Sequence, residues 1–167
     1  PRHTKPPASP PRLTGVRADR FTNPDRRAED IWVAIYGTDN RVDHSWFAGK
    51  GNGGVTLAVI RPKGQPGENR ARIDHNFFGP RPPLGSNGGE TIRIGTSDES
   101  LSDSKSIVEN NWFEGCDCEV EIVSVKSGPN IIRGNMVVES QGAMVLRHGD
   151  RSEGHTDGLQ SRAYAGT

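Results

Sequence analysis

One pattern of apolar and polar residues recurs along the chain about every 24 to 35 residues. Each copy has an aliphatic residue, two or three polar residues and then a pair of large apolar residues. The copies are VRADRF at 16–21, VDHSWF at 42–47, IDHNFF at 73–78, VENNWF at 108–113 and IRGNMV at 132–137. A turn cluster and a second short apolar run follow each copy: DIWVAIYG at 30–37, GVTLAVI at 54–60, GETIRIG at 89–95, EVEIVSV at 119–125 and GAMVLR at 142–147.

This repeat predicts an all-β solenoid, a parallel β-helix, in which each copy forms one coil and coils stack roughly 4.8 Å apart. Equivalent positions of stacked coils then form columns inside the solenoid. The expected aromatic column is Phe21, Phe47, Phe78 and Phe113, continued by Val137. A second column, Asn76, Asn111 and Asn135, places amides where they can bond turn backbone. A β-sandwich is the alternative, but the two-residue turns of hairpins are scarce in the chain.

Composition agrees with a thin core and a large polar surface. The chain has 167 residues, enough for one domain, with 31% hydrophobic residues and a mean hydropathy of −0.70. Its 21 Lys and Arg balance 21 Asp and Glu, so no overall field attracts nucleic acid or a membrane, and neither is expected as a partner. The chain has no transmembrane run, and an acidic ligand would need a local basic site.

The two ends differ from the repeats between them. Residues 1–12 are proline-rich and polar, which predicts a disordered leader. The β-helix is expected over 13–149, and residues 150–167, which lack the apolar repeat, are expected to be an irregular tail. Cys116 and Cys118 are one residue apart, so a bridge between them would be strained and free thiols are expected.

The run EVEI at 119–122 places two acids on one strand face, if Val120 and Ile122 point inward. Glu119 and Glu121 would then repel each other unless a cation lies between them. Ca²⁺ suits carboxylate and amide oxygens, and Asn87, one coil upstream, could add a carbonyl oxygen. A solvated acidic strand face is the alternative.

Lys126 follows the same run, and Arg147 ends the equivalent run of the next coil, 21 residues later. Lys126 has the opposite parity to Glu121, so a bend must intervene if both are to reach one face. Two adjacent cations disfavour each other's charge, and a lysine that yields its proton is a usable general base. An ordinary surface pair is the alternative. Arg93 and Lys50 are outward-facing basic candidates for a polyanion groove.

With these residues considered, residues 13–149 resemble polysaccharide lyase family 6, which contains alginate lyases and chondroitinase B. The specific segments are NGGETIRIG at 87–95, CEVEIVSVKS at 118–127 and LRHG at 146–149, and the repeats at 42–50 and 73–82 look like those of the family. The resemblance implies a right-handed parallel β-helix. Members are much longer than this chain, which is therefore expected to be a truncated β-helix.

The resemblance also implies roles for individual residues. Asn87, Glu119 and Glu121 match the family's Ca²⁺ ligands, Lys126 its Brønsted base and Arg147 its general acid, while His148 would line substrate subsites. The implied reaction is Ca²⁺-dependent β-elimination on a uronic-acid polysaccharide, with alginate favoured over chondroitin or dermatan sulfate. Such a polymer implies a secreted or periplasmic protein.

Two other functions remain open from the sequence. A non-catalytic β-helix that binds polyuronate, or a structural β-helix, would need no particular role for Lys126. A glycoside hydrolase on the same solenoid would need two suitably separated carboxyl groups, and Glu119 and Glu121 lie close together along one strand.

Overall fold

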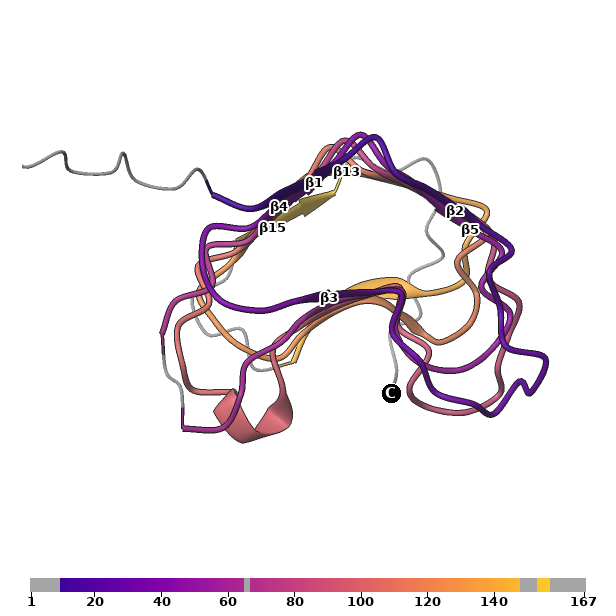
Figure 1. The fold of residues 1–167 in the computed structure, drawn as a ribbon, viewed down its shortest axis with the longest axis horizontal. Coiled ribbons are helices and arrows are strands. Elements are labelled where there is room, and N and C mark those ends of the chain that lie inside the picture. The colour runs from indigo at the N-terminus through magenta and orange to yellow at the C-terminus, as the bar shows by residue number, and fades with distance from the viewer. Residues whose placement is uncertain (1–9, 65–66, 148–152, 157–167) are drawn as a thin grey trace, which may run out of the picture.

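The computed structural model describes residues 10–64, 67–147 and 153–156. They form a solenoid whose successive coils superimpose when viewed down its axis (Figure 1). All paired strands run parallel, and each pairs with the equivalent strand of a neighbouring coil. The right-handed parallel β-helix expected from the sequence is therefore confirmed. Within the described residues, no helix is long and apolar enough to cross a membrane.

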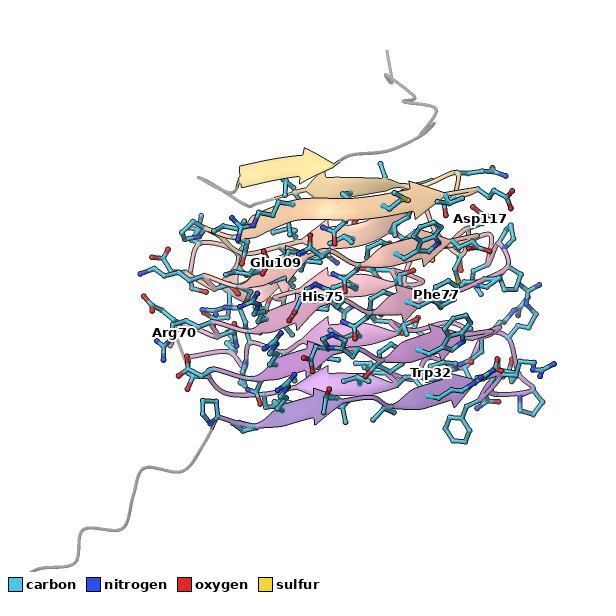
Figure 2. The ribbon with its side chains drawn as sticks, turned by 90° about the horizontal axis from the view of Figure 1, so that it is seen from above. Trp32, Arg70, His75, Phe77, Glu109 and Asp117 are labelled. Atoms are coloured by element: carbon cyan, nitrogen blue, oxygen red, sulfur yellow. The ribbon has the colours of Figure 1, made fainter. Side chains whose placement is uncertain are left out.

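Three parallel sheets run along the solenoid, and each of the first five coils gives strands to all of them (Figure 2). Sheet A contains β1 (Arg12–Thr14), β4 (Arg41–Asp43), β7 (Arg72–Asp74), β10 (Ile107–Glu109), β13 (Ile131–Val138) and β15 (Glu153–Thr156). Sheet B contains β2 (Arg17–Asp19), β5 (Trp46–Ala48), β8 (Phe77–Phe78), β11 (Trp112–Glu114) and the second half of β13. Sheet C contains β3 (Val33–Ile35), β6 (Leu57–Val59), β9 (Ile92–Ile94), β12 (Glu121–Val125) and β14 (Ala143–Leu146).

Sheet C lies across the solenoid from sheets A and B, and the core fills the space between them (Figure 1). Most of the predicted inward column is confirmed. Phe47, Phe78 and Phe113 stack with ring centroids 5.5 and 5.0 Å apart, and Val137 continues the column as the register partner of Phe113. Stacked rings at coil spacing remove their faces from water and fix which residues of successive coils face each other.

The first coil departs from the prediction, because Phe21 is 77% exposed and Ala18 pairs with Phe47 instead. Leu13, the partner of Val42, supplies the aliphatic position of this coil. Gly15 has a positive φ of 66°, and His44, at the same position of the next coil, has a positive φ of 48°. The copy in the first coil is thus LTGVRA at 13–18, and the match to VRADRF at 16–21 was three residues out of register.

The predicted asparagine column is confirmed and lies at the bend between sheets A and B. The Asn135 Oδ1 accepts from the backbone N–H and the Nδ2 of Asn111, both at 3.0 Å. Asn111 bonds Asn76 in the same way, and its Nδ2 also donates to the Ile73 carbonyl at 2.9 Å. These buried amides pair backbone groups that the bend leaves outside the strand ladders.

The outer face of sheet A carries a ladder of arginines and acids that joins successive coils. Arg12 bonds Asp43, and Arg41 donates to Asp74 at 2.8 and 2.6 Å. Arg72 and Arg133 both pair with Glu109. The hydrogen bonds from Arg12 outweigh the effect of burial and hold the pKa of Asp43 well below its ordinary value.

The ends of the solenoid differ from the sequence prediction. Strand β1 begins at Arg12, inside the expected leader, whose residues 1–9 lie outside the described part of the chain. Strand β15 lies within the expected irregular tail and pairs with β13. Its residues, EGHT, are polar, so the apolar repeat gave no signal of a strand there; the exposed backbone of β13 provides a template for parallel pairing.

Replacing Asn111 with alanine should lower the free energy of unfolding by about 2 kcal/mol or more, because buried backbone groups of Asn76 and Ile73 lose their partners. Urea unfolding followed by circular dichroism measures this change. Asn23→Ala, which removes an exposed amide contact with the Asp25 N–H, is the matched control and should change little. Equal loss in both variants would contradict the structural role of the column.

The protein should lose stability in acid partly through Asp43. Its pKa is depressed in the fold, so the stability it contributes is present above the ordinary aspartate range near pH 4 and lost as pH falls through the folded value. Asp43→Asn should therefore lower the unfolding midpoint at pH 7 and reduce its further fall between pH 4 and pH 2. Urea midpoints across this range test the prediction, and parallel curves for both proteins would contradict it.

Candidate active site

The loops that lead from sheet B to sheet C form one edge of the solenoid, where the labelled Asp117 lies (Figure 2). A cleft of about 660 Å³ opens among them. Asn87 lines it from the third coil, Glu119 from the fourth and Arg147 from the end of β14. Three residues that the sequence singled out from distant positions thus share one cleft.

The carboxylate of Glu119 is fixed by the backbone of the third coil. Its Oε2 accepts from the N–H groups of Gly88 at 2.9 Å and Gly89 at 2.8 Å. Gly88 has a φ of 97°, and a Cβ on Gly89 would lie 2.6 Å from the Cys118 Sγ, so this turn requires both glycines. The turn therefore places Asn87 beside Glu119.

A β-bulge in β12 sets the faces of the residues that follow Glu121. The register with β14 shifts between Glu121 and Val123, and both Ile122 and Val123 are buried in the core. After this irregularity Val125 points inward, so Lys126 points outward. The bulge supplies the bend that the sequence argument required. One detail was wrong: Val120 does not point inward but is 75% exposed, because it precedes the strand.

Lys126 and Arg147 occupy equivalent positions in adjacent coils. Leu146 pairs with Val125, and the Arg147 N–H donates to the Val125 carbonyl at 2.9 Å. Both side chains therefore leave the outward face of sheet C. Arg147 bonds the buried carboxylate of Glu121 through its Nε, while the Lys126 Nζ lies 3.2 Å from the Glu90 Oε1.

Glu90 is the functional candidate that the sequence analysis missed. It is 1% exposed, and its Oε2 is buried without a hydrogen-bond partner. The motif NGGETIRIG contains it, but a glutamate two residues before the apolar positions of a strand looks like an ordinary polar turn residue. The signal that could have found it is its place one coil below the acidic run at 119–121.

Arg81 supports this part of the cleft from inside the solenoid. Its Nη1 donates to the Gly89 and Glu90 carbonyls at 2.7 and 2.8 Å, and its Nη2 donates to the Asn52 and Gly54 carbonyls. The guanidinium is buried, which lowers the pKa of Arg81. Arg81 therefore ties together the turns of the second and third coils.

The other residues that the sequence predicted for the site are Lys50, Arg93 and His148, and the structure bears on each of them differently. Lys50 is not an outward groove residue: it is 1% exposed, and its Nζ bonds Asp30 at 2.5 Å and the Gly53 carbonyl at 2.6 Å. It faces inward to satisfy a turn. Arg93 does point outward from β9, between Ala58 and Ser124 of neighbouring strands, with no ion pair among the described residues. His148 lies outside the described residues.

The oxygen donors at this edge fit a hard cation. Among the described side chains, no three His, Cys, Asp or Glu form a metal cluster, so a site here depends on the Asn87 amide as well as carboxylates. Asn87, Glu119 and Glu121 supply the oxygen types that Ca²⁺ prefers. Cys116 and Cys118 are free, as expected, and burial raises the pKa of both thiols.

The chain is similar to a family model and to solved structures. The model described as chondroitinase B matches residues 2–157. The structure described as PL6 family alginate lyase AlyGC is 55% identical, with a TM-score of 0.79 over 83% of this chain and 19% of that one. A mannuronic acid specific polysaccharide family 6 lyase from human gut microbiota is 45% identical, with a TM-score of 0.79 over 83% of this chain and 32% of that one.

A third structure, a PL6 alginate lyase in complex with a trisaccharide, is 30% identical, with a TM-score of 0.73 and the same two coverages as the gut enzyme. None of the curated proteins matches the chain. The chain spans between 19% and 32% of the length of these solved structures. The match to the family model over most of the chain, together with the shared fold, shows that it belongs to the chondroitinase B family, polysaccharide lyase family 6.

Proposed function

We propose that the protein is a Ca²⁺-dependent polysaccharide lyase that cleaves a uronic-acid polymer by β-elimination. The observation that carries the proposal is the adjacency of Lys126 and Arg147 on the outward face of sheet C, beside the cleft lined by Asn87 and Glu119. The solved relatives described as alginate lyases favour alginate as the substrate. The family model described as chondroitinase B keeps chondroitin or dermatan sulfate as the second candidate.

Asn87, Glu119 and Glu121 would hold the calcium ion through their side-chain oxygens. Bound Ca²⁺ would neutralise the carboxylate of the sugar and so make the neighbouring C5 proton more acidic. Glu119 is already oriented for such a role by the Gly88 and Gly89 amides, which leave its Oε1 without a hydrogen bond in the described structure. The turn thus orders the Glu119 carboxylate before calcium binds, which reduces the entropy that binding would cost.

Lys126 in its neutral form would take the C5 proton onto Nζ. The electron pair of the C5–H bond then forms the C4–C5 double bond, and the bond between C4 and the glycosidic oxygen breaks. Arg147 would stabilise the departing oxygen and give it a proton. Arg93, outward on the neighbouring strand β9 and without an acidic partner among the described residues, would bind a further carboxylate of the polymer. His148 would add a substrate contact beyond Arg147.

The proposed function also implies where the protein is located. Uronic-acid polysaccharides are met outside the cytoplasm, so we infer a secreted or periplasmic protein.

Lyase activity should depend on both cations. With alginate and Ca²⁺, the protein should raise the ultraviolet absorbance that marks the new C4–C5 double bond. Lys126→Ala and Arg147→Ala should each reduce kcat by about 100-fold or more, since each removes a proton-transfer or charge-stabilising group. Lys105→Ala, which removes a half-exposed lysine paired with Glu68, is the matched control and should keep normal activity. Full activity in both site variants would refute the assigned roles.

Calcium should bind independently of catalysis. Isothermal titration calorimetry should detect Ca²⁺ binding to the protein, and Asn87→Ala or Glu119→Gln should weaken it at least about tenfold by removing an oxygen donor. Glu114→Gln, on the outer face of sheet B where it accepts from Trp112, should bind as the wild type does. Unchanged affinity in both cleft variants would place the ion elsewhere.

A further inference from the structure

Glu90 is a buried acid in an unusual setting. Its side chain is buried, its Oε1 lies 3.2 Å from the Lys126 Nζ, and its Oε2 has no hydrogen-bond partner. Burying a carboxylate with one unmet oxygen costs free energy, so a purely structural residue at this position would be better replaced by an apolar one. Such a cost is typical of groups that are retained for chemistry.

The geometry around Glu90 is rigid. Arg81 donates to the carbonyls of Gly89 and Glu90, and the Glu90 carbonyl also accepts from the Thr56 N–H at 3.3 Å. The next residue, Thr91, donates its N–H to the Ile122 carbonyl. The backbone that carries Glu90 is thus fixed to both neighbouring coils, and its carboxylate has a defined position under Lys126.

We propose that Glu90 is the positioning residue of the base: it aims the Lys126 Nζ and stabilises the ammonium that forms when Lys126 takes the C5 proton. The inference rests on the proposed function, because it assigns a partner to the base of that reaction. The proton stays on the Lys126 Nζ, and Glu90 remains a carboxylate throughout. A negative partner that is buried and nearby is worth more to a developing ammonium than water is.

The other charged groups near Lys126 leave this pairing in place. Arg93 lies on the same outward face of β9, and Arg147 lies at the equivalent position after β14. Arg147 is engaged by Glu121, at the start of β12 itself. Glu90 is thus the carboxylate within ion-pair distance of Lys126 among the described residues.

Two measurements on Glu90→Gln test the inference, because glutamine keeps the shape and an acceptor oxygen but removes the charge. The first is the rate at which an acetylating reagent modifies Lys126 at fixed pH, followed by mass spectrometry. It should rise about tenfold, since losing an adjacent opposite charge increases the neutral fraction of an amine. The second is the pH profile of kcat on alginate. Its rising limb should move to lower pH while its plateau falls.

Two further variants complete the design. Glu109→Gln removes another buried glutamate that pairs with cations, on sheet A, and should change neither the Lys126 labelling rate nor the rising limb. Glu90→Asp keeps the charge, so it should keep the rising limb in place while lowering the plateau, because the shorter side chain aims Nζ less well. Lys105 serves as the internal reference for labelling, and circular dichroism shows whether each variant folds.

The outcomes distinguish failure of the Glu90–Lys126 pairing from failure of the proposed lyase function. An unchanged Lys126 labelling rate in Glu90→Gln overturns the inference whether or not the protein is a lyase. Faster labelling with an unmoved pH limb and plateau overturns the role of Glu90 in the reaction. Faster labelling in a protein that makes no unsaturated product from any uronic-acid polymer supports the pairing and refutes the proposed function instead. If Glu90→Gln does not fold, a displaced rising limb in Glu90→Asp overturns the inference.

Discussion

The hydrogen-bonded register between successive coils is the constraint on which the site depends. Lys126 and Arg147 are adjacent only because Val125 and Leu146 are partners, and an error of one residue would send one of the two side chains into the core. Two columns fix this register from within: the stacked rings that end at Phe113, and the amides that end at Asn135. The polar chemistry outside the solenoid is thus specified by packing and amide bonds inside it.

The bulge in β12 interrupts the regular strand pairing next to the candidate site. A regular strand would place Glu121 and Lys126 on opposite faces, since their separation is odd. The shift between Glu121 and Val123 puts two successive residues, Ile122 and Val123, in the core, so that Lys126 leaves the outward face of sheet C. A local irregularity in strand pairing therefore makes the proposed catalytic arrangement possible, as is common where strands carry function.

The repeat predicted the fold, the two columns and the adjacency of Lys126 and Arg147, because all of these follow from spacing along the chain. The repeat gave wrong predictions where tertiary contacts, rather than spacing along the chain, determine the position of a side chain. Lys50 looked like a surface cation, yet Asp30 and a turn carbonyl draw it inside. Phe21 fitted the aromatic column by type, but the smaller Ala18 occupies that place. Glu90 resembles an ordinary polar turn residue, so its place one coil below the acidic run gains meaning only from the contact with Lys126.

The charges of the site also explain how several carboxylates can share one edge. Glu90 and Glu121 each have a cation as partner, whereas Glu119 is held by backbone amides and keeps one oxygen without a hydrogen bond in the described structure. Arg81 adds a buried positive charge nearby but gives its Nη donors to backbone carbonyls, so it occupies none of these carboxylate oxygens. Its positive charge attracts the Glu90 carboxylate without using the oxygens of that carboxylate. Each of these acids thus has a cationic or hydrogen-bond-donating partner, and Glu119 keeps the oxygen that the proposed calcium site would use.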